Sequence, residues 1–212
     1  MSGSRNPVAR VESTKHAAHS QATLDKRRLL IVHGFGVATC VFRPLLQRLN
    51  DAAVSAQLFR YPSVGLELGE IVSRLSKYLE ESRPDAIIAH SLGCIAVWLA
   101  AHDAQRRGRL VFLAPPLKTL PVTRLIPSMM RFPFAPLLDH RALFSASAFD
   151  LPTLSGCTIR TISGRNDYLV PISCTRHPDV TDARMTIHTH NSMLFSRRVA
   201  DLSRDWILSE IS

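Results

Sequence analysis

The chain alternates short apolar segments with longer segments whose apolar residues suit one or more faces of a helix. An apolar run of four residues, such as 29–32 or 86–89, is typical of a parallel strand buried on both faces of a sheet. We therefore expect strands at 29–32, about 54–60, 86–89 and 110–114. Helices are expected between them at 41–51, 66–79 and 92–101, the last of them capped by Gly108. This alternation predicts a parallel sheet with right-handed crossovers.

The pattern changes after residue 114. Residues 117–152 contain five prolines together with several leucines, methionines and phenylalanines. A stretch of that length between strands is better explained by short helices than by a structureless loop. We interpret it as a lid or cap, with a helical patch that only completes the core as the alternative. Strands at 158–163 and about 184–188 and a final helix follow, so the sheet has about six strands.

The first candidate chemistry lies between the strand at 86–89 and the helix at 92–101. Ser91 occupies the turn, and the small residues Ala89 and Gly93 allow the helix to start close to the strand. Such a turn is strained and leaves the serine hydroxyl exposed at the carboxyl edge of the sheet. The alternative is an ordinary turn in which Ser91 caps the helix.

Two further loops lie where strands end. The sequence His33-Gly34-Phe35-Gly36 follows the first strand, and its glycines allow backbone amides to face a cavity. Asp167 follows the strand at 158–163, and His190 precedes the final helix. Serine needs an imidazole to take its proton and a carboxylate to orient that imidazole, and the chain supplies both in the order Ser91, Asp167, His190. His188 is a rival base, and Asp150, Asp179 and Asp182 are rival acids.

These motifs resemble the α/β-hydrolase superfamily, and within it compact bacterial esterases and lipase-like proteins. The resemblance covers Leu29 to about Ile211 and departs from the usual pattern at Ala89, where glycine is expected. It implies an α/β-hydrolase fold with a mostly parallel sheet, helices on both faces and a short lid over Ser91. It also implies an oxyanion hole formed by the backbone amides of Phe35 and Leu92.

Composition limits the alternatives. The 212 residues predict one domain at 27–212, preceded by an arm at 1–26 that lacks apolar periodicity. The net charge of +9 is scattered and forms no basic stripe with aromatics, so nucleic-acid binding is not expected. The four cysteines lack metal or disulfide spacing, and no motif predicts a metal or a cofactor. We find no membrane span or secretory leader and expect a cytoplasmic protein, with no indication of its oligomeric state.

The expected function is that of a serine hydrolase acting on a small-molecule ester or thioester through an acyl-enzyme. The lid supplies more apolar surface than a loop requires, so we expect an apolar acyl group bound by Met129, Met130 and Phe132. An acyltransferase with the same three residues, or a binding protein that only retains the fold, are the alternatives.

Overall fold

The computed structural model describes residues 26–145 and 151–209. Six parallel strands form a single sheet in the order β2-β1-β3-β4-β5-β6. Their bounds are Arg27–Val32 (β1), Val54–Phe59 (β2), Ala86–His90 (β3), Gly108–Leu113 (β4), Cys157–Gly164 (β5) and Val180–Thr186 (β6). The prediction of a mostly parallel sheet of about six strands is confirmed.

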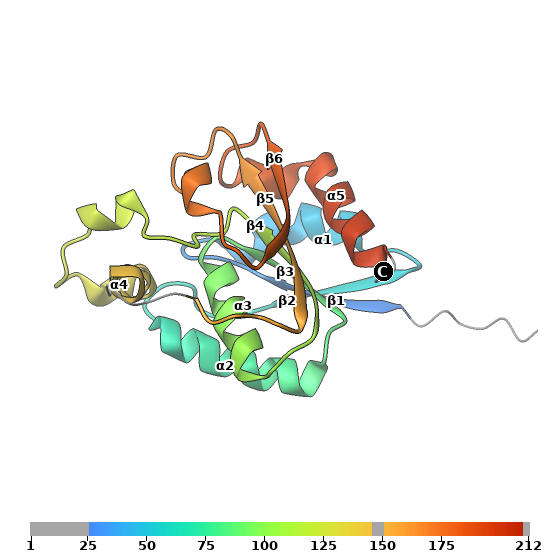
Figure 1. The fold of residues 1–212 in the computed structure, drawn as a ribbon, viewed down its shortest axis with the longest axis horizontal. Helices are drawn as coiled ribbons and strands as arrows, with labels where there is room; N and C mark the ends of the chain where they lie inside the picture. The colour runs from blue at the N-terminus through green and yellow to red at the C-terminus, as the bar shows by residue number, and fades with distance from the viewer. Residues whose placement is uncertain (1–25, 146–150, 210–212) are drawn as a thin grey trace, which may run out of the picture.

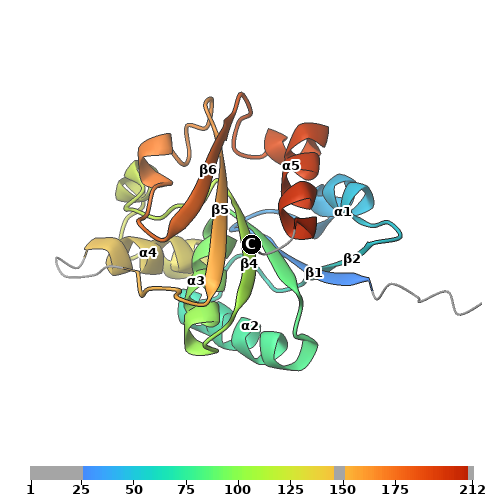
Figure 2. The same cartoon turned by 45° about the vertical axis from the view of Figure 1, so that its right-hand side comes forward.

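Helices cover both faces of this sheet (Figures 1 and 2). The helices α1 (Arg43–Leu49) and α5 (Arg197–Leu208) lie on one face and α2 (Leu68–Ser82) and α3 (Leu92–Asp103) on the other. Each face has its own core of buried apolar side chains, because the central strands alternate their residues between the two. The strands β3 and β4 are buried almost throughout, as expected for the middle of a parallel sheet.

The segment between β4 and β5 contains the short 3-10 helix η2 (Pro121–Leu125) and the helix α4 (Arg131–Ser145). In Figure 1 both lie to the left of the sheet, on the side away from the start of β1. Polar contacts fix α4 to the body: Asp139 accepts a hydrogen bond from the Leu68 amide at 2.9 Å, and the His140 ring donates one to the Pro116 carbonyl at 2.8 Å. The expected lid therefore contains helices, although residues 146–150 of its range lie outside the described residues.

Two local expectations were wrong. The last strand starts at Val180 rather than about Arg184, because β6 is an edge strand whose exposed polar residues hide the strand pattern. The helix α3 ends at Asp103, so Gly108 does not cap it but opens β4 with φ +134°. The arm predicted at 1–26 lies almost wholly outside the described residues. Within those residues, no helix is both long and apolar enough to cross a bilayer.

Candidate active site

Ser91 forms a sharp turn between β3 and α3. Its backbone has φ 54° and ψ −131°, a combination that a side chain normally avoids. Two glycines make room for this turn. A Cβ on Gly93 would lie 2.4 Å from the His33 carbonyl oxygen, and one on Gly34 would lie 2.8 Å from the Ser91 Cβ. Ala89 lies inside β3, fully buried between its neighbouring strands, where a methyl group fits.

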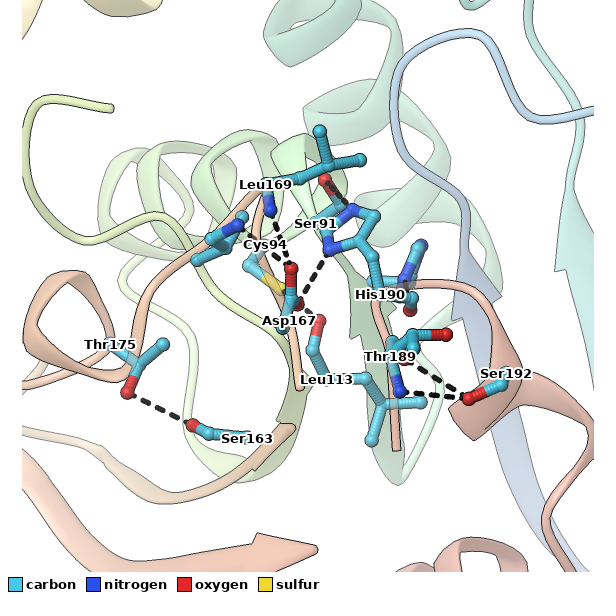
Figure 3. Close-up of polar contacts among 12 residues, drawn as sticks. Ser91, Cys94, Leu113, Ser163, Asp167, Leu169, Thr175, Thr189, His190 and Ser192 are labelled. Carbon is cyan, nitrogen blue, oxygen red and sulfur yellow. Dashed lines mark hydrogen bonds and ion pairs between the residues drawn. The ribbon is translucent and has the colours of Figure 1, made fainter. Parts of the chain in front are cut away.

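The structure brings Ser91, His190 and Asp167 together (Figure 3). The His190 Nε2 is 2.9 Å from the Ser91 Oγ, and the His190 Nδ1 is 2.8 Å from the Asp167 Oδ2. A carboxylate can only accept hydrogen bonds, so Asp167 holds the proton of the His190 ring on Nδ1. This leaves Nε2 free to accept the serine proton. Three loops that follow β3, β5 and β6 supply these side chains.

The carboxylate of Asp167 is itself held on both sides. Its Oδ1 accepts hydrogen bonds from the amides of Leu169 at 3.0 Å and Val170 at 2.9 Å, while its Oδ2 faces His190. The side chain has no exposed surface. A buried carboxylate that accepts from three donors keeps its orientation without help from solvent.

Tyr61 holds the loop that follows β1 in place. The Tyr61 hydroxyl donates to the His33 carbonyl at 2.5 Å, and the two rings stack with centroids 4.1 Å apart. Burial lowers the pKa of His33 and raises that of Tyr61, so both rings are neutral at pH 7. Within the described residues, the amides of Phe35 and Leu92 donate no hydrogen bond. The oxyanion hole expected from these two amides stays a prediction.

His90 has a position that the sequence did not predict. Its Nε2 donates to the main-chain oxygen of His190 at 3.0 Å, and the centroids of the two imidazole rings are 4.7 Å apart. Burial lowers the pKa of His90 to about 3, so its ring stays neutral beside His190. The only signal in the sequence was that His90 adjoins Ser91.

The rival residues have other partners. Asp179 accepts from the Leu154 amide at 3.0 Å, and Asp182 forms ion pairs with Arg160 and Arg184. His188 is half-buried, and its carbonyl passes so close to Gly164 that a Cβ there would lie 2.2 Å from it. Asp150 lies outside the described residues. Cys94 is buried, which raises the pKa of its thiol far above the ordinary value and argues against a nucleophilic role.

The lid approaches the loop after β1. The rings of Phe134 and Phe35 have centroids 5.9 Å apart, and the Pro133 carbonyl accepts a hydrogen bond from the Gly65 amide at 3.2 Å. Met129, Met130 and Phe132, expected to bind substrate, have exposed side chains on the outer part of the lid. In the described part of the chain, no group of three or more histidine, cysteine, aspartate or glutamate side chains has an arrangement suited to a metal ion.

A family model supplies the classification. The model of the alpha/beta hydrolase family matches residues 29–206. The chain belongs to this family. The match includes all six strands of this α/β hydrolase except the first two residues of β1, together with the lid and the loops that carry Ser91, Asp167 and His190. No curated protein sequence matches it at a significant level.

Solved structures share the α/β-hydrolase fold at low sequence identity. The esterase domain of a Rhodothermus marinus protein is 15% identical, with a TM-score of 0.58 and 85% of each chain covered. Est1E from Butyrivibrio proteoclasticus is 14% identical, with a TM-score of 0.60 and coverage of 89% of this chain and 90% of that chain. RedJ, a thioesterase from the prodiginine biosynthetic pathway in Streptomyces coelicolor, is 18% identical, with a TM-score of 0.57 and coverage of 93% and 90%.

Proposed function

We propose that this α/β hydrolase is a serine hydrolase that cleaves a carboxylic ester or thioester with an apolar acyl group. One observation carries the proposal. The Ser91 hydroxyl, the His190 ring and the Asp167 carboxylate form a continuous path of hydrogen bonds of 2.9 and 2.8 Å. That geometry has little use in a protein that only binds a ligand, because it serves to remove the proton from a serine.

The reaction follows from these contacts. His190 takes the Ser91 proton as Oγ attacks the acyl carbon, and the charge that develops on the acyl oxygen is held by the amides of Phe35 and Leu92. The protonated ring then gives its proton to the leaving alcohol or thiol. Water, deprotonated by His190, attacks the acyl-enzyme and releases the acid and free Ser91.

Two features support an apolar acyl group. The paired rings of Phe35 and Phe134 provide apolar surface next to the loop that packs on Ser91. Met129, Met130 and Phe132 add exposed apolar side chains on the lid. Each methylene buried against such a surface contributes about 0.8 kcal/mol, so longer chains gain until the available surface is covered.

The test combines labelling with turnover. A fluorophosphonate is expected to label the wild-type protein but not Ser91→Ala, and Ser91→Ala should lose on the order of a millionfold in kcat. The matched control is Ser73→Ala, an exposed serine on α2, which should be labelled and turn over normally. A panel of nitrophenyl esters and acyl thioesters of graded chain length then measures acyl preference. Wild-type protein that is neither labelled nor active on any member of the panel would refute the proposal.

A further inference from the structure

Large apolar side chains are exposed on the two loops that flank the candidate active site. Leu125, Met129 and Phe132 of the lid are 82%, 90% and 79% exposed, and Tyr168, next to the acid, is 88% exposed. Met130 and Leu169 lie beside them and are exposed to a smaller degree. Single exposed apolar residues are common, but a group of six around one site indicates a surface that contacts another body. We call these six residues the apolar rim.

The two halves of the apolar rim are joined by a small core of their own. Leu120 and Val122 of the lid pack against Val170 and Cys174 of the loop that follows Asp167. The Leu117 amide also donates to the Cys174 carbonyl at 2.8 Å. The base of the lid and the loop after Asp167 therefore form one packed unit. This unit lies at the carboxyl edge of the sheet, where the half-buried Ser91 also lies.

The charges around the apolar rim are cationic. The side chains of Lys118, Arg124 and Arg165 are exposed and, in the described part of the chain, form no ion pair or hydrogen bond. The acids near the lid are already occupied, since Glu67 and Asp139 both pair with Arg131. The acid of the neighbouring loop, Asp167, is buried against His190. The surface therefore offers exposed apolar groups and unpaired positive charges together.

We propose that the apolar rim and its three cations dock the protein on an anionic lipid surface, with Ser91 facing the lipid. Apolar side chains that enter the boundary between headgroups and acyl chains, flanked by lysine and arginine, are what binds a protein to such a surface. The inference rests on the proposed function in one respect, because the protein would find an apolar acyl substrate in the lipid surface.

A bilayer fits these observations better than a protein partner does. The most exposed rim residues stand almost free of their neighbours, which suits a deformable surface more than the close shape match of a protein interface. A second copy of the chain is disfavoured, because a symmetric contact through this surface would place its cations against identical cations.

The test is flotation of the full chain with vesicles of ether-linked lipids, which carry no ester for the protein to cleave. We expect binding to vesicles that contain ether-linked phosphatidylglycerol, weaker binding as salt is raised, and little binding to ether-linked phosphatidylcholine alone. Replacing Lys118, Arg124 and Arg165 together by glutamine should lower the partition coefficient on the order of a hundredfold, about fivefold for each cation. Met129→Ser and Phe132→Ser should each lower it on the order of tenfold.

Matched controls separate this surface from the net charge of the protein. Lys77, Arg83 and Arg107 are exposed and lie on the C-terminal half of α2 or in the connections before β3 and β4, so their triple glutamine variant loses the same charge elsewhere. Met185→Ser removes an apolar side chain exposed on β6. Both controls should bind as wild type does, and thermal unfolding should show that every variant folds.

Several results would overturn the docking proposal. These are no binding to anionic vesicles at low salt, equal binding to phosphatidylcholine, and equal losses in the rim and control variants. Retention by an immobilised acidic carrier protein without vesicle binding would also overturn it, in favour of a protein partner. Vesicle binding does not require turnover, so a protein that binds but hydrolyses no soluble ester would contradict only the proposed function.

Discussion

Replacing Asp167 by asparagine tests how the candidate site holds its base. The carboxylate faces one ring N–H with Oδ2 and two backbone N–H groups with Oδ1, so all three neighbours are donors. An asparagine has one oxygen and one amide NH₂ and cannot accept on both sides. In one orientation its NH₂ faces His190, the ring keeps its proton on Nε2, and Ser91 loses its base.

The other orientation keeps the correct tautomer but points the NH₂ at the amides of Leu169 and Val170. It leaves two buried donors without partners, each costing about 1–3 kcal/mol, so it is disfavoured by roughly 2–6 kcal/mol. Its population is then between about one in thirty and about one in twenty-five thousand. The variant also lacks the negative charge that stabilises the imidazolium, so we expect kcat to fall about 10³ to 10⁴-fold.

The assay is kcat on a soluble nitrophenyl ester, with the rate of fluorophosphonate labelling measured in parallel. Asp182→Asn is the matched control, since this carboxylate pairs with Arg160 and Arg184 away from the site and should leave kcat unchanged. The stability of Asp167→Asn should change by no more than about 1 kcal/mol, because the inactive orientation satisfies both amides. An Asp167→Asn variant with more than a tenth of wild-type kcat would refute this reasoning.

Three further predictions concern the supports of the site. Gly34→Ala should lower kcat on the order of a hundredfold and destabilise the fold by about 1–3 kcal/mol, because the added Cβ would meet backbone atoms and the Ser91 Cβ. Gly69→Ala is the control and should change neither, because no atom lies within 4 Å of a Cβ added there. His90→Gln keeps a donor near the Nε2 position and should retain most of the wild-type kcat and its pH profile. His90→Leu should lose on the order of tenfold in kcat at unchanged KM. Equal activity in the two variants would show that the hydrogen bond to His190 does not contribute to kcat. Burial lowers the pKa of His90 to about 3 and of His140 to about 4, so the stability that these neutral rings contribute is complete above pH 6.5 and declines as pH falls. By pH 5 each ring should lower the free energy of unfolding by about 2 kcal/mol. Denaturant titrations should show a smaller loss between these pH values in His140→Gln.

The order of strands and helices was predictable because the central strands β3 and β4 consist almost entirely of apolar residues. The edge strand β6 was the exception. Its exposed positions carry residues such as Thr181 and Arg184, so only part of it has the pattern of a strand. The choice of Ser91, Asp167 and His190 came from their order along the chain and from their loops after strands. The structure brings all three within hydrogen-bonding distance, while their catalytic roles stay predictions.

The supports of the site were much harder to predict. Nothing in the spacing of Tyr61 and His33 indicates that the Tyr61 hydroxyl donates a hydrogen bond to the His33 carbonyl. The contact between His90 and the backbone of His190 joins residues 100 positions apart and depends on the register of three strand pairs. Sequence patterns report burial and local conformation, but contacts between distant loops require the strand order and the register together.

The separation between Ser91 and His190 also bears on how the protein is made. The two residues are 99 positions apart, and the strands β4, β5 and β6 must be in place before the ring reaches the hydroxyl. During translation the nucleophile leaves the ribosome long before its base. Under the proposed function, a nascent chain therefore carries an unreactive serine until β6 has joined the sheet, and recovery of activity would time a late step of assembly rather than the first.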